Sequence, residues 1–233
     1  LPPLSSMSTP CATSTTPAAA STDLPTTSPA STRILLISGA LAGPLFGVLA
    51  AGQVLLRDGF DLQQHPLSLL ATGGPGFVQV ANFILAGIGV LCLAVAVRRT
   101  ITDGVGRRWL APLIAVFGVG LVASGVFVMD PENGFPIGTP AGPAPAMSWH
   151  GIAHIIAATV AFTGLAAACI VLAVRMGRRH AGWAAVLNSC AALIFLAPVN
   201  PAWASIQVAF NGLVAFIWTT AVALWLLRPS SAR

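Results

Sequence analysis

Six long apolar segments, separated by short polar stretches, constrain this chain more than any other feature. A helix needs about 20 apolar residues to cross a bilayer, and lipid tolerates only helices or closed barrels because it cannot satisfy backbone polar groups. The segments lack the alternation of apolar and polar residues that strands show, so we expect helices. They lie at residues 34–56, 76–97, 109–129, 149–174, 183–199 and 203–227. The sequence therefore predicts an all-α fold, an integral membrane bundle of six transmembrane helices.

The charged residues support this assignment and predict an orientation. Only 7% of the residues are charged, whereas about a quarter of the residues of a soluble domain are. The chain has eleven arginines and no lysine, and ten of the eleven fall on one side of the predicted helices. The positive-inside rule assigns that side to the cytoplasm. We expect a multi-pass protein of the cell membrane with both termini cytoplasmic, and no nucleic-acid partner, since the arginines flank helix ends.

Composition divides the chain into three regions. Residues 1–32 are rich in Ser, Thr, Pro and Ala, and they lack the apolar content that offsets the entropy of ordering. We expect them to be a disordered tail. Residues 33–228 form the six-helix transmembrane domain, and residues 229–233 form a short cytoplasmic tail. The fifth helix is the weakest of the six, because its segment is short and ends in the breakers LAPVNP.

Two histidines open the fourth segment, in the motif SWHGIAH. His150 and His154 are four residues apart, so they share one face of a helix and can bind one metal ion, such as zinc. They can instead form hydrogen bonds to a neighbouring helix or loop. Ser148 is the expected N-cap of this helix. The motif lacks the glutamate of the HExxH metalloproteases.

The predicted orientation places most of the acidic residues on the extracytoplasmic side. Asp130 follows the outward C-terminal end of a helix, where the helix dipole repels negative charge. Arg57 is the one arginine on that side, so an ion pair of Arg57 with Asp130 or with Asp61 is expected to join the two outer loops. His65 lies in the first of these loops, and the same residues can instead serve a ligand site.

Polar pairs also lie near the outer ends of two apolar segments. Gln79 and Asn82 share a face of the second helix, and Gln207 and Asn211 share a face of the sixth. Amides are costly in lipid, so these faces should turn into the bundle. They can form interhelical hydrogen bonds, or they can line a polar cavity open to the outside.

Several of these stretches together resemble one family of proteins. RDGFDLQQHPLSLL, followed by Gly76, Gln79 and ANF, and then DPENGFPIGTPAG and SWHGIAH, resemble the domain of unknown function 998 family over roughly residues 34–227. The resemblance implies a polytopic membrane protein, and it implies no particular activity. The family-motif positions are Asp61, His65, Pro66, Gln79, Asn82, Asp130, Pro131, Gly134, Phe135, His150 and His154.

These observations predict two alternative functions. The first is a protein with an extracytoplasmic pocket lined by His and Asp, which binds or moves a lipid headgroup or a small polar ligand, with membrane lipid as its partner. The predicted ligand-binding residues are Arg57, Asp61, His65, Gln79, Asn82 and Asp130. The second is an intramembrane metal-dependent hydrolase that holds zinc with His150 and His154. A haem site ranks below both, because two histidines on adjacent turns cannot bind opposite faces of one haem.

Overall fold

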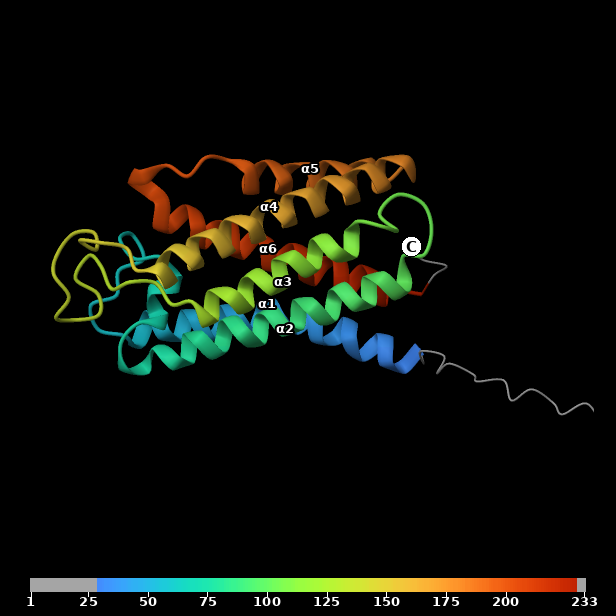
Figure 1. Ribbon diagram of the computed structural model, residues 1–233. Helices are drawn as coiled ribbons and strands as arrows, with labels where there is room; N and C mark the ends of the chain where they lie inside the picture. The colour runs from blue at the N-terminus through green and yellow to red at the C-terminus, as the bar shows by residue number, and fades with distance from the viewer. Residues whose placement is uncertain (1–28, 230–233) are drawn as a thin grey trace, which may run out of the picture.

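The described part of the protein, residues 29–229 of a computed structural model, is all-α (Figure 1). It contains six α-helices and three short 3-10 helices. The α-helices are α1 (Pro29–Leu56), α2 (Phe77–Thr100), α3 (Leu110–Val126), α4 (Trp149–Arg178), α5 (Gly182–Leu196) and α6 (Ala204–Leu227). The 3-10 helices are η1 (Leu67–Ala71), η2 (Gly74–Gly76) and η3 (Pro201–Trp203). The all-α class and the presence of six helices are confirmed.

Four helices are long and apolar enough to cross a membrane. They are α1, α2 extended by η2, α4, and α6 extended by η3. Helices α3 and α5 are apolar but shorter, with 17 and 15 residues. Both end before the predicted segments do, because the backbone turns extended at the C-caps Phe127 and Ala197. Length and composition thus support four spans directly.

The first helix begins earlier than the sequence predicts. Residues 29–32, which we assigned to the disordered tail, form the first turn of α1. Pro29 is tolerated there because the first backbone N–H groups of a helix have no intrahelical partner. The rest of the predicted tail, residues 1–28, and residues 230–233 lie outside the described part of the chain.

The helices pack in chain order, and glycines permit the close approaches. Each of α1 to α4 packs against the next helix, and α6 returns to pack against α1. A Cβ added to Gly39 would lie 2.7 Å from the Cβ of Leu93 in α2, and one added to Gly43 would lie 2.8 Å from the Cβ of Phe216 in α6. The GxxxG motif of α1 therefore serves two different neighbours.

One seam between the helices stays open. Helix α6 makes only light contact with α5, and α4 and α6 show no packing comparable to that of the other neighbouring pairs. Aromatic residues from α1, α2, α3 and α6 fill the centre of the bundle, among them Phe46, Phe83, Phe117 and Phe216. The candidate site lies where the seam meets this aromatic core.

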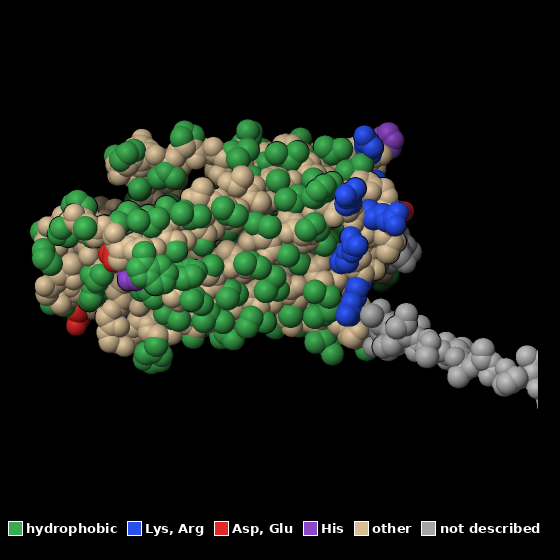
Figure 2. Space-filling view, viewed as in Figure 1, with side chains coloured by type: hydrophobic (Ala, Val, Ile, Leu, Met, Phe, Trp, Pro, Cys, Tyr) green, Lys and Arg blue, Asp and Glu red, His purple; other side chains and the backbone are tan. Residues whose placement is uncertain are grey.

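Charge separates the two ends of the bundle. Arginines gather at one end, which we call the arginine end, formed by the α2–α3 and α4–α5 connections (Figure 2). The opposite end, which we call the histidine end, consists of residues 57–76, 127–148 and 197–203. Between the two ends the visible surface is predominantly hydrophobic, as a lipid-facing surface should be (Figure 2).

Candidate functional site

Arg57 anchors the first loop of the histidine end without an acidic partner. Its guanidinium donates to the carbonyl oxygens of Leu70 at 2.6 Å and Thr72 at 2.9 Å, at the end of η1. Its charged carbon lies 4.7 Å from the centre of the Phe135 ring, a cation–π geometry. The expected ion pair with Asp130 or Asp61 is therefore wrong. Backbone carbonyls and an aromatic face satisfy the cation instead.

His65 joins the two loops of the histidine end. Its Nδ1 accepts the backbone N–H of Asp61 at 2.9 Å, so its Nε2 carries the proton and donates to the carbonyl oxygen of Asn133 at 3.0 Å. The ring packs between Phe60 and Phe135, at centroid distances of 5.4 and 5.3 Å. The two loops do meet, as predicted, and a neutral imidazole is what connects them.

The Asp61 carboxylate turns to its own loop. It accepts the backbone N–H of Gln63 at 2.9 Å and the side-chain amide of Gln64 at 3.0 Å. These hydrogen bonds stabilise the charged form and lower the pKa of Asp61. The carboxylate thus holds the turn that presents Gln63 and Gln64 to the cavity described below.

Asp130 lies at the N-terminus of α4. Its Oδ2 accepts the backbone N–H of Ser148 at 2.8 Å, and Ser148 caps the helix by accepting the N–H of Gly151 at 3.1 Å. Burial raises the pKa of the Asp130 carboxyl, but the hydrogen bonds from Ser148 and the charge of His150 outweigh this effect, so the pKa lies below its usual value. The dipole of α4, and not Arg57, offsets the repulsion from the end of α3. The predicted N-cap is confirmed.

The two histidines of α4 bind the C-terminal end of α3. The Nδ1–H of His150 donates to the carbonyl oxygen of Val128 at 2.7 Å. The Nδ1–H of His154 is shared by the carbonyls of Ser124 at 3.1 Å and Phe127 at 2.8 Å. These are carbonyls that the end of a helix leaves unsatisfied, so the pair fastens two helices together.

This geometry bears on the metal hypothesis. The described residues contain no group of three or more His, Cys, Asp or Glu side chains that could hold a metal ion. His150 and His154 act as hydrogen-bond donors to α3, which is the alternative that the sequence left open. We therefore derive no reaction through zinc.

Gln79 and Asn82 face α1. Gln79 Oε1 accepts from Gln53 of α1 at 2.7 Å and from Asn82 at 3.2 Å, and Asn82 also donates to the carbonyl oxygen of Phe46 at 3.1 Å. All three amides are buried, with exposed fractions of 8% or less. The structure places these residues in the α1–α2 interface, where they form interhelical hydrogen bonds.

A large cavity lies at the seam, on the histidine-end side. We call it the α4–α6 cavity; its volume is about 720 Å³. It is bounded by α4, α6, the α5–α6 connection and the two loops of the histidine end. Its polar lining residues are Gln63, Gln64, Ser68, Glu132, Asn133, His154, Thr159, Thr163, Ser205 and Asn211. Phe162 and Val208 contribute to the apolar part of the wall.

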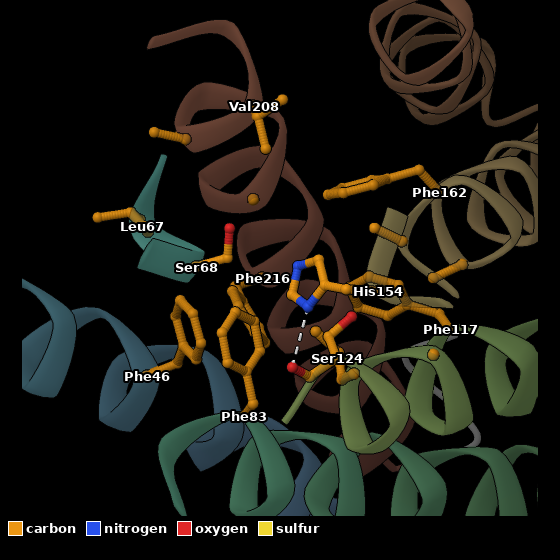
Figure 3. Close-up of a pocket in the computed structure, with 16 residues that line it drawn as sticks. Phe46, Leu67, Ser68, Phe83, Phe117, Ser124, His154, Phe162, Val208 and Phe216 are labelled. Atoms are coloured by element: carbon orange, nitrogen blue, oxygen red, sulfur yellow. Dashed lines mark hydrogen bonds between the residues drawn. The ribbon is translucent and has the colours of Figure 1, made fainter. Parts of the chain in front are cut away.

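A smaller apolar pocket continues the cavity into the bundle. Its volume is about 80 Å³, and Phe46, Phe83, Phe117 and Phe216 are among the residues that line it (Figure 3). The two spaces share Ser68, His154, Ala158, Phe162 and Val208. His154 therefore lies at the boundary between the larger cavity, which has both polar and apolar lining residues, and its aromatic floor.

Three buried polar side chains line this cavity and each carries a polar atom without a hydrogen-bond partner. His154, Ser205 and Asn211 have exposed fractions of 5%, 7% and 6%. The Nδ1 of His154 binds α3, and Figure 3 shows the other ring nitrogen, Nε2, turned away from Ser124 toward Ser68 and Val208. The side chains of Ser205 and Asn211 make no hydrogen bond with the described residues. These are the groups that a ligand would reach.

The sequence pointed to only part of this set. It paired Asn211 with Gln207, but Gln207 binds the backbone of Asn200 and Pro198, both at 3.0 Å, and closes the α5–α6 connection. Ser205 was missed. A signal was present, because Ser205, Val208 and Asn211 recur every three residues and so lie along one side of the helix.

The fold and the spans define a class: a multi-pass, all-α membrane protein with a cavity of mixed polar and apolar lining near one end. Within this class, residues 40–227 match the family described as Protein of unknown function (DUF998), and the chain belongs to that family. This confirms the resemblance seen in the loop motifs. No curated protein and no solved structure matches the chain.

Proposed function

We propose that this protein binds a lipid headgroup or a small polar ligand in the α4–α6 cavity. One observation carries the proposal: three side chains that are more than nine-tenths buried, His154, Ser205 and Asn211, direct unpaired polar atoms into a single cavity. These polar atoms open onto the cavity and have no hydrogen-bond partner among the described residues, so a bound molecule can supply their hydrogen bonds.

The size and lining of the cavity suit an amphiphile. Ligand sites for small molecules have volumes of about 300–1,000 Å³, and this cavity has about 720 Å³. Gln63, Gln64 and Glu132 line it at the loops, whereas Phe162 and Val208 lead to the aromatic floor. Because the seam between α4 and α6 is open, the apolar chain of a bound lipid could extend through it into the bilayer. Only the head group would then have to enter the cavity.

The proposal includes an arrangement in the membrane. We infer that all six helices cross it, with the arginine end in the cytoplasm and the histidine end outside. At 1.5 Å per residue, the 17 residues of α3 reach about 25 Å, close to the hydrocarbon thickness. The positive-inside rule supports the orientation, and the cavity then opens to the outer leaflet.

Cysteine labelling tests this orientation. In a background without the native cysteines, Met147→Cys marks the histidine end and Thr102→Cys marks the arginine end; both positions are exposed. An impermeant thiol reagent should label the first variant in intact cells and the second only after lysis. The reverse order would place the cavity on the cytoplasmic side.

A filled cavity tests the binding function itself. Ala158 lines both the cavity and the inner pocket, so the indole of Ala158→Trp should occupy the site. Val160→Trp adds the same bulk at a position of the same helix whose side chain is 53% exposed. We expect native mass spectrometry of protein extracted in a mild non-ionic detergent to find a bound amphiphile in the wild type and in Val160→Trp. Ala158→Trp should lack it. Equal retention in both variants would refute the site.

A further inference from the structure

We infer that the α4–α6 cavity selects a head group that carries hydrogen-bond donors and no negative charge, such as a long-chain amine or a hydroxyl-bearing lipid. This inference rests on the proposed function and specifies its ligand. The charges and the lone pairs of the lining residues support it.

Glu132 is the charged residue among those that line the cavity. Its carboxylate forms no ion pair within the described part of the chain, where both salt bridges involve Asp103 at the arginine end. No arginine contributes to the lining. Arg57, the arginine of the histidine end, is engaged by two carbonyls and by Phe135. A phosphate head group would thus meet a carboxylate and no cation.

The lone pairs of the lining point to the same class of ligand. His154 uses its Nδ1–H toward α3, so its Nε2 faces the cavity as an acceptor. The side-chain amide of Gln64 donates a hydrogen bond to Asp61, and its side-chain carbonyl oxygen has no hydrogen-bond partner. Together with the two oxygens of Glu132, these atoms offer acceptors to a donor. Asn211 and Ser205 offer both donors and acceptors and so fit a hydroxyl or an ammonium group equally well.

Competition among three matched amphiphiles tests the inference. Hexadecylamine, glycerol monopalmitate and hexadecyl phosphate carry chains of the same length and differ mainly in the head group. Purified protein in a mild non-ionic detergent is mixed with equal amounts of all three, and native mass spectrometry counts the bound species. We expect the amine and the glycerol ester each to exceed the phosphate by at least about fivefold, the factor that one net hydrogen bond supplies. The ratio of amine to ester tells which of the two head groups fits better.

Two charge variants sharpen the test. Glu132→Gln removes the carboxylate from the cavity, and Asp58→Asn removes one from an exposed position of the same end that does not line the cavity. Glu132→Gln should lower the share of bound amine and raise that of phosphate, with the ester unchanged. Asp58→Asn should leave all three shares as they are.

The outcomes separate this inference from the proposed function. If the phosphate binds as well as the other two, or if both charge variants act alike, the head-group inference is wrong. Binding that Ala158→Trp abolishes would then still support a ligand site of different selectivity. If Ala158→Trp leaves the binding of all three amphiphiles unchanged, the cavity is not the site and the proposed function fails.

Discussion

Gly151 offers a test in which helix propensity and tertiary contact predict opposite signs. It lies in the first turn of α4, where alanine would ordinarily stabilise a helix by about 0.5–1 kcal/mol. A Cβ at this position, however, would overlap Oδ2 of Asp130 and lie 3.3 Å from its Cγ. We therefore expect Gly151→Ala to destabilise the protein.

The magnitude follows from what the carboxylate loses when it is displaced. Its charged hydrogen bond from the Ser148 N–H, 2.8 Å long, is worth about 1.5–3 kcal/mol. Its interaction with the helix dipole adds about 0.3–1 kcal/mol. After the gain in propensity is subtracted, Gly151→Ala should lower the free energy of unfolding by roughly 1–3 kcal/mol.

A double-mutant cycle isolates the contact. In an Asp130→Ala background the obstacle is gone, so Gly151→Ala should be neutral or stabilising. Gly47→Ala is the matched control, since Gly47 lies in α1 with no atom within 4 Å of an added Cβ. The assay is thermal unfolding in a fixed detergent. An equal shift of the melting temperature by Gly151→Ala with and without Asp130 would contradict a contact between the added Cβ and the carboxylate.

Three other predictions concern the hydrogen bonds that hold the loops at the two ends of the bundle. Because the pKa of Asp130 is lowered in the folded state, its contribution is present above the pKa of the unfolded chain and is lost as the pH falls through the folded value. The stability gap between wild type and Asp130→Asn should therefore close on acidification from neutral pH, and a constant gap would contradict this. The buried Arg175 donates to the carbonyls of Asp103 at 2.8 Å and Val105 at 2.7 Å, so Arg175→Lys should lower the melting temperature and the exposed Arg178→Lys should not. His65→Phe keeps the aromatic packing but loses two hydrogen bonds, so it should cost about 1–3 kcal/mol and increase hydrogen exchange at the Asp61 amide, which donates to His65.

The loop motifs predict which residues gather at the histidine end, but not the partners of those residues. Asp130, Arg57 and the two histidines of α4 were recognised as a group that gathers at one end, and they do gather there. The predicted partner of Asp130 was wrong, and the partners of the histidines were left open. Charge suggested Arg57 as the partner of Asp130, whereas the backbone N–H of Ser148 at a helix N-terminus donates to it. Every residue has a backbone carbonyl group and almost every residue has a backbone N–H, so the residue types do not show which of these groups are unpaired. That depends on where each helix begins and ends.

Hydrophobicity determined the all-α fold and the order of the helices, and the placement of the arginines determined the contrast between the two ends. Those properties follow from local composition, since lipid requires each apolar segment to satisfy its own backbone. Only the tertiary structure decided which polar residues face a cavity. Gln79 and Asn211 are similar in sequence context, yet Gln79 accepts a hydrogen bond from an amide of α1 and Asn211 lines the α4–α6 cavity. That difference depends on whether a neighbouring helix packs closely against the same face, and helix packing is a property of pairs of segments far apart in the chain.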